Sequence, residues 1–349
     1  MTKVRGFAPA TIANVGPGFD VVGLALNEPG DEVEVEFTSK FKGVKLVDIV
    51  NNPGLPLGPK NVVEAVGQRL YDSINPKTKE RYGVKVVLYK NMKIGTGMGS
   101  SASSEAAMAI AMLGLLGHPL EFYLKDVLQA VVYGEEVATG SPHSDNALPS
   151  LLGGSLVIYD GNNLNYIRFL GNSSISLVVA SPDLRLDTRD MRKVLPDTNK
   201  LVELTRSLLK ERATLKKPSY NLSAYNLSQI VKGVTEETIN RYLEGSLKVM
   251  YGLKHNDAVL LGEGVLNDDI ITPIRARFIK GYDDVKDAAL QEGAYGFSIS
   301  GSGPSLFAVA SSINKAHKIG EAMIKAWERN DVKAVIYVSP INNQGARII

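Results

Sequence analysis

The chain has 349 residues, of which 44% are apolar and 22% charged, as in a folded globular protein long enough for two domains. Lysine and arginine (39) nearly balance aspartate and glutamate (37), so the chain lacks the basic excess of a nucleic-acid binder. It contains no cysteine, which excludes disulfides, thiolate metal sites and a cysteine nucleophile. Because neither a signal peptide nor a membrane-spanning apolar run is recognisable, we expect no membrane partner and a cytoplasmic location.

The first half of the chain is predicted to alternate strands and helices. Apolar periodicity and turn residues predict strands at 4–10, 31–38, 83–89 and 154–159, and helices at 61–74, 100–116 and 120–139. The second half is predicted to contain a buried strand at 175–180, mostly helices at 188–264 with a loop at 216–223, a helix at 283–292, two strands within 296–310, a helix at 313–329 and a strand at 332–338. Glycine and asparagine cluster at 161–174, and we therefore predict two domains, 1–168 and 169–349.

The segment 93–104, KIGTGMGSSASS, is the most informative motif. Its three glycines, Gly95, Gly97 and Gly99, allow the backbone to turn several N–H groups toward one point. Serines and a long alanine-rich helix follow, so that the helix N-terminus and the hydroxyl groups predict an anion site. The alternative is a serine-capped glycine turn before a close-packed helix. The motif is neither a Walker A loop nor a dinucleotide-binding GxGxxG turn.

Two further segments carry polar and glycine residues in apolar surroundings. Segment 298–309, SISGSGPSLFAV, is by itself a glycine turn that joins two apolar strands. Segment 8–26 places Asn14 and Asp20 on either side of a Gly-Pro-Gly turn. Buried polar side chains of this kind need partners, which a ligand or a local Asx turn and helix cap can supply.

Together the three segments resemble the motifs of GHMP kinases. GMGSSA is similar to their GLGSSA phosphate loop, 298–309 is similar to SGxGP[ST]xFA, and 8–26 has the ANxGPGFDxxGxAL form that homoserine kinases carry. The resemblance implies an α+β fold in two domains, the first like domain 2 of ribosomal protein S5 and the second ferredoxin-like. It also implies ATP-dependent phosphorylation of the side-chain hydroxyl of homoserine, a step of threonine biosynthesis.

The resemblance further implies a nucleotide site and a metal site. The nucleotide-binding residues are expected to be Asn61, Val62, Lys93, Ile94, Gly95, Thr96, Gly97, Met98, Gly99, Ser100, Ser101, Ala102 and Ser103. Segment 134–146 resembles GExxxSGxxHxDN, in which the first glutamate, here Glu135, binds Mg²⁺ together with a loop serine, here Ser101. The alternative for Glu135 is a solvated helix carboxylate.

The acceptor site is implied in the same way. The substrate-binding residues are expected to be Asn14, Asp20, His143, Arg192, Arg275 and Gly301, and the catalytic residues Asn14, Asn146 and Arg192. A free amino acid needs a guanidinium for its carboxylate and an acid for its ammonium group, which fits this set. Because Asn146 occupies the position of a carboxylate base in sugar kinases, we expect catalysis by positioning and charge stabilisation, and Asp145 is the residue that could overturn this expectation.

Some features leave alternatives open. The family's HQPYR segment reads ITPIR at 271–275, and the region between Pro196 and Asn267 is longer than the family pattern requires. Both features concern the acceptor side, so a kinase for another hydroxy acid, such as shikimate, pantoate or mevalonate, is the alternative. A non-catalytic relative should have a degraded phosphate loop, whereas the loop motif of this chain is intact. Family likeness also leads us to expect a homodimer.

Overall fold

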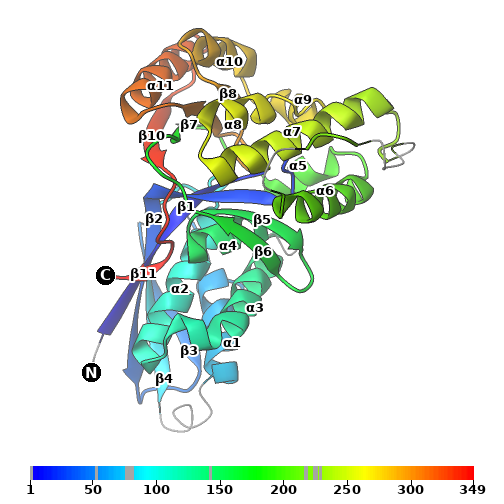
Figure 1. Cartoon of the computed structure of the whole chain (residues 1–349). Coiled ribbons are helices and arrows are strands. Elements are labelled where there is room, and N and C mark those ends of the chain that lie inside the picture. The colour runs from blue at the N-terminus through cyan, green and yellow to red at the C-terminus, as the bar shows by residue number, and fades with distance from the viewer. Residues whose placement is uncertain are drawn as a thin grey trace.

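The computed structural model describes residues 3–51, 54–74, 82–140, 144–215, 219–222, 227 and 230–349. Its elements form two β-sheets with helices packed against them, one sheet mainly from each half of the chain (Figure 1). The α+β class and the two-part architecture predicted from the sequence are confirmed.

The larger sheet contains β1 (Lys3–Ala13), β2 (Val22–Thr38), β3 (Val44–Val50), β4 (Gly83–Tyr89), β5 (Ser155–Asp160), β6 (Asn165–Phe169) and β11 (Arg347–Ile348). Its main path is β11-β1-β2-β4-β3, while β5 pairs with the first residues of β2 and with β6. Only the β3–β4 pair is parallel among these described strands. Since β2 is 17 residues long, it can pair with β5 at its start and with β4 at its end.

Helices α1 (Val62–Ile74), α2 (Ser100–Leu116), α3 (Leu120–Thr139) and α4 (Ser144–Leu152) pack on this sheet. Helix α2 contacts β1, β2 and the other three helices, which explains why its sequence is apolar on nearly all sides. The small side chains of α2 and the glycine at position 6 of β1 together permit a close approach of helix and sheet. A Cβ at Gly6 would lie only 2.5 Å from the carbonyl oxygen of Ala107. Helix α2 therefore lies directly against β1.

The smaller sheet contains β7 (Ser176–Pro182), β8 (Gly296–Ile299), β9 (Leu306–Ala310) and β10 (Ala334–Pro340) in the antiparallel order β10-β7-β9-β8. Helix α11 (Ile313–Glu328) connects β9 to β10, and the whole is the ferredoxin-like βαββαβ arrangement. Val178 and Ala180 of β7 face the core under α10 (Tyr282–Gln291) and α11, whereas Leu177 and Val179 face the opposite core. Both faces of this sheet are therefore buried.

A shared core joins the two halves. It combines residues of β1 and β2, such as Ile12 and Leu24, with Leu177 of β7 and Leu247 from the helical region that follows. Around it lie α5 (Thr188–Lys193), α6 (Asn199–Ala213), α7 (Glu236–His255), α8 (Ala258–Val265) and α9 (Thr272–Ala276). The chain changes sheets after Phe169, and β11 then returns to the larger sheet beside β1.

Most predicted elements occur with ends within a few residues of those expected, and α2 and α3 have the predicted bounds. Five elements were not predicted: β3, β11, the short helices α4, which contains Pro149, and α9, and β6, which lies inside the predicted boundary region. Within the described ranges, no helix is both long and apolar enough to cross a membrane.

Candidate active site

A cavity of about 520 Å³ lies between the two halves of the molecule, which is within the range of small-molecule sites. The β1–β2 loop, the phosphate loop, the facing ends of α3 and α4, and helix α5 all contribute to its wall. The cavity thus brings together side chains that are far apart in sequence.

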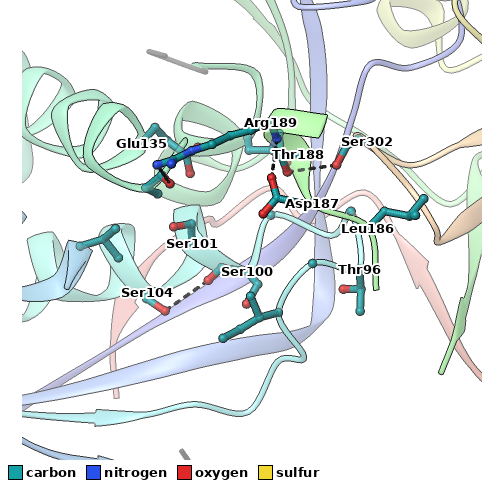
Figure 2. A pocket seen from close by; sticks show the side chains of 18 of the residues that line it. Thr96, Ser100, Ser101, Ser104, Glu135, Leu186, Asp187, Thr188, Arg189 and Ser302 are labelled. Carbon is teal, nitrogen blue, oxygen red and sulfur yellow. Dashed lines mark hydrogen bonds between the residues drawn. The ribbon is translucent and has the colours of Figure 1, made fainter. Parts of the chain in front are cut away.

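The phosphate loop leads directly into α2 at one end of this cavity. Helix α2 begins after Gly99, which has a left-handed backbone (φ 66°) and offers no side chain to cap the helix. The hydroxyl of Ser100 is buried and has no hydrogen-bond partner among the described residues. Figure 2 shows Thr96, Ser100 and Ser101 along this loop. Uncapped N–H groups, the helix dipole and these hydroxyls make an anion site.

Two glycines of the loop are required by close contacts. A Cβ at Gly97 (φ 80°) would lie 2.2 Å from the carbonyl oxygen of Ser300, and one at Gly99 would lie 2.1 Å from the hydroxyl of Thr11. The loop is also hydrogen-bonded to the β8–β9 turn, because Ser300 Oγ donates to Gly97 O (2.7 Å) and Ser305 N donates to Thr96 O (3.0 Å). The two glycine motifs therefore hold each other in place.

A buried ion pair lies beneath the same loop. Lys90 Nζ bonds Asp31 of β2 and donates to Ser100 O (2.7 Å) and Ser104 Oγ (2.8 Å). The other oxygen of Asp31 accepts from the backbone N–H groups of Asn91 (2.9 Å) and Met92 (3.0 Å). Every member of this network is satisfied, so it fixes the start of α2 relative to β2 and β4.

Two buried carboxyl groups face the cavity from α3 and α4. Glu135 is 4% exposed and Asp145 is 3% exposed. Burial, reinforced by the neighbouring Asp145, raises the pKa of Glu135 to about 8. Burial also raises the pKa of Asp145 to about 7, with the negative charge of Asp20 as the next cause. Glu135 is thus not the solvated helix carboxylate that the sequence left open.

Helix α5 closes the cavity from the second half of the chain. Asp187 caps this helix by accepting from Arg189 N (2.8 Å), and the Thr188 hydroxyl lies 3.1 Å from that of Ser302. Arg189 donates to the carbonyl oxygen of Ala138 at the end of α3 (2.9 Å). In Figure 2 its side chain extends above Ser101 toward Glu135.

The other end of the cavity contains two arginines beside one carboxylate. Arg192 of α5 donates to Asp20 Oδ2 (2.5 Å), and the guanidinium carbons of Arg192 and Arg275 lie 5.0 and 5.1 Å from the ring centroid of Phe19. Asn14 Oδ1 accepts from Asp20 N, six residues later (2.9 Å), which closes the loop by a longer span than the Asx turn that the sequence allowed. Both Asn14 (φ 55°) and Asp20 (φ 57°) have left-handed backbones, a conformation that Asn and Asp tolerate better than most residues.

Arg275 is positioned by a different device from the one the family motif suggests. It lies on α9 and donates to Gly301 O (2.9 Å), while Asp268 caps the start of α9 through the N–H groups of Ile271 (2.8 Å) and Thr272 (3.0 Å). Burial lowers the pKa of Arg275 to about 10, and the guanidinium nevertheless stays charged at neutral pH. The helix cap therefore orients this arginine without the missing histidine and tyrosine.

Comparison with known proteins identifies the family of this chain. Residues 60–154 match the model of the GHMP kinases N terminal domain, and residues 249–329 match that of the GHMP kinases C terminal domain. A homoserine kinase of Chlorobium phaeobacteroides is 35% identical over all of both chains, and one of Pyrococcus abyssi is 31% identical over 97% of each. The crystal structure of homoserine kinase from Cytophaga hutchinsonii is 33% identical, with a TM-score of 0.84 over 100% of this chain and 98% of the other.

The chain is a GHMP kinase of the homoserine kinase family. A galactokinase structure from Lactococcus lactis shares the fold at 17% identity, with a TM-score of 0.68 over 99% of this chain and 94% of the other.

In this GHMP kinase, most of the residues predicted from the motifs do line the cavity. They are Asn14, Asp20, Asn61, Val62, Ile94, Gly95, Thr96, Gly97, Gly99, Ser100, Ser101, Glu135, Asn146, Arg192, Arg275 and Gly301. Asn146 Oδ1 accepts from the Thr11 hydroxyl (2.7 Å). Asn61 caps α1 through its bond from Val63 N (3.0 Å). His143 lies outside the described residues.

Four loop residues predicted to bind the nucleotide do not line the cavity. Met98 and Ala102 are buried in the cores, and Ser103 donates to Ala8 O (2.7 Å). Lys93 forms an exposed ion pair with Asp183 (2.9 Å). The residues missed include Lys90, Asp187, Thr188, Arg189 and Ser302, which also line the cavity. Ser302 lies within segment 298–309, and Asp187, Thr188 and Arg189 lie three to five residues before the predicted Arg192.

We expect Lys90→Met to destabilise the protein by about 3–5 kcal/mol, because it leaves the buried Asp31 carboxylate without its cation. The double variant Lys90→Met/Asp31→Asn should recover part of this loss, since no buried charge remains. Urea unfolding at equilibrium measures both changes. A loss of less than about 1 kcal/mol in Lys90→Met would show that the pair does not support the loop.

The metal-free protein should lose stability as the pH rises from about 5 to about 8. Over this range the unfolded chain has released the protons of Glu135 and Asp145 while the folded protein retains them, so deprotonation increasingly favours unfolding. Thermal melts in EDTA should show a falling melting temperature, and Glu135→Gln should reduce that slope. If the melting temperature falls with pH equally steeply in wild type and Glu135→Gln, Glu135 does not cause this pH dependence.

Proposed function

We propose that this protein transfers the γ-phosphate of ATP to the side-chain hydroxyl of L-homoserine and releases ADP and O-phospho-L-homoserine. The observation that carries the proposal is the pairing of an anion site at the start of α2 with Arg192, Arg275 and Asp20 in one cavity. The first part suits the phosphates of a nucleotide, and the second suits the carboxylate and ammonium groups of a free amino acid.

For the nucleotide, the uncapped N–H groups at the start of α2 and the hydroxyls of Ser100 and Ser101 would bind the phosphates. Asn61 and Val62, at the start of α1, would contact the base or sugar, as the sequence predicted. The interlocked glycine turns keep the loop rigid, so that binding the phosphates needs little reorganisation.

The cavity also fits a magnesium ion. Glu135 supplies a buried carboxylate and Ser101 a hydroxyl, the oxygen ligands this cation prefers, and the raised pKa of Glu135 indicates a site that needs positive charge. When bound, Mg²⁺ would neutralise the charge of the nucleotide phosphates. Arg189 adds a fixed positive charge at the same end of the cavity.

For the acceptor, Arg192 and Arg275 would bind the carboxylate while Asp20 binds the ammonium group, and Asn14 would orient the hydroxyl. Asp20 is already held by Arg192 and by a bond from Arg206 to its carbonyl oxygen (3.0 Å). Holding the hydroxyl next to the anion site converts phosphoryl transfer into a reaction between positioned groups.

Asn146 cannot accept a proton, whereas Asp145 beside it is a carboxyl group whose pKa burial raises to about 7. The charge of Asp20 raises the pKa of Asp145 and the charge of Arg192 lowers it. We therefore assign Asp145 to the charge balance of the amino-acid site rather than to proton transfer. A cytoplasmic location and a homodimer remain predictions from the sequence.

Initial rates of ADP release with Mg·ATP should be high for L-homoserine and negligible for shikimate, pantoate and mevalonate. Arg192→Gln and Arg275→Gln should each raise the KM for homoserine roughly 10- to 100-fold, since each removes a charged hydrogen bond. Lys193→Gln and Arg277→Gln are matched controls, because these neighbouring side chains are exposed. Faster turnover of another acceptor would overturn the assignment of homoserine as the substrate but not the assignment of kinase activity.

Asp145→Asn should raise the KM for homoserine more than it lowers kcat, and kcat should stay within about tenfold of the wild-type value. The pH–rate profiles of both proteins provide the decisive comparison. A fall in kcat of about 100-fold or more, together with loss of the acidic limb near pH 7, would make Asp145 the general base.

A further inference from the structure

Glu105 is a fully buried glutamate beside the cavity that has no part in the proposed reaction. It lies on α2 one turn after Ser101, so that both side chains are on the same face of the helix. The side chain of a helical residue leans toward the helix N-terminus, which directs the Glu105 carboxyl group toward Ser101. That end of α2 is where nucleotide phosphates and the metal are proposed to bind.

The neighbouring helix leaves space for this carboxyl group. A Cβ at Gly134 of α3 would lie 2.7 Å from Glu105 Cδ, so the carboxyl group lies directly against the backbone that precedes Glu135. Glu105 is therefore a neighbour of both residues proposed as metal ligands, Ser101 on its own helix and Glu135 on the next. The pKa of Glu105 is raised well above its usual value, first by burial and second by the negative charge of Glu135.

Few interactions within the protein offset the cost of burying the Glu105 carboxyl group. Neither of its carboxylate oxygens has a hydrogen-bond partner among the described residues. The neighbouring Ser101 hydroxyl favours the ionised form of Glu105. Lys90, the nearby buried cation, is bonded to Asp31. An uncompensated buried carboxyl group is costly, and buried polar groups without partners require an explanation.

We propose that Glu105 is a positioning residue for the divalent cation, orienting the Ser101 hydroxyl and adding a second carboxylate behind Glu135. This inference rests on the proposed kinase function, in which Ser101 and Glu135 hold Mg²⁺. Groups behind the direct ligands of a metal orient those ligands, and their removal typically weakens metal binding 10- to 100-fold.

The test is Mn²⁺ binding to the protein in the presence of ADP, followed by electron paramagnetic resonance of the free ion. Glu105→Gln has the same shape as glutamate but no charge, and it should weaken Mn²⁺ binding about 10- to 100-fold. ADP binding in EDTA should stay within about twofold of wild type. Glu136→Gln is the matched control, because Glu136 follows Glu135 on α3 but is exposed.

Gly134→Ala provides a second variant that leaves the carboxylate in the chain but displaces it, and it should weaken Mn²⁺ binding in the same direction. Glu105→Asp should retain part of the affinity. Unchanged Mn²⁺ affinity in Glu105→Gln would overturn the inference and make Glu105 a structural, neutral acid. If the wild-type protein with ADP fails to bind Mn²⁺, the proposed function fails instead.

Discussion

The buried ion pair of Lys90 and Asp31 is the interaction on which the rest of the site depends. It joins the end of β4, the middle of β2 and the first turn of α2 in one satisfied network. Without a fixed starting point, the N–H groups of α2 could not converge on an anion. A buried pair adds little stability over an apolar core of the same volume, so its value here is the position it gives the helix.

The remaining constraint is that each half of the molecule completes the other. The phosphate loop belongs to the first half, yet its glycines are shaped by the β8–β9 turn, and Gly301 N bonds Ala13 O (3.0 Å) at the end of β1. The buried carboxyl groups Glu135 and Asp145 of the cavity accordingly come from the first half, whereas its arginines come from the second. Carboxyl groups and guanidinium groups from different halves therefore line one small space, which suits the phosphates, cation and zwitterionic acceptor proposed for it.

The sequence predicted those parts whose chemistry lies within a short segment. Helix α2 has the predicted bounds because Gly99 and Gly117 mark both ends, and the motif residues Asn14, Asp20 and Arg192 meet in the cavity as expected. Helix α4 was missed because Pro149 interrupts its helical pattern, and β6 because its alternation is short and flanked by turn residues. Lys90 was missed because a single lysine after a strand acquires meaning only from Asp31, 59 residues earlier.

The ITPIR segment shows how the position of an arginine can be kept although the rest of the family's motif is absent. Arg275 needs a fixed direction toward Phe19 and Gly301, and the Asp268 cap of α9 supplies it through backbone N–H groups that any sequence provides. The proposed acceptor site can therefore obtain a buried guanidinium of defined orientation without the family's histidine and tyrosine. For this reason the missing histidine and tyrosine do not argue against an amino-acid acceptor, and the position of the arginine argues for one.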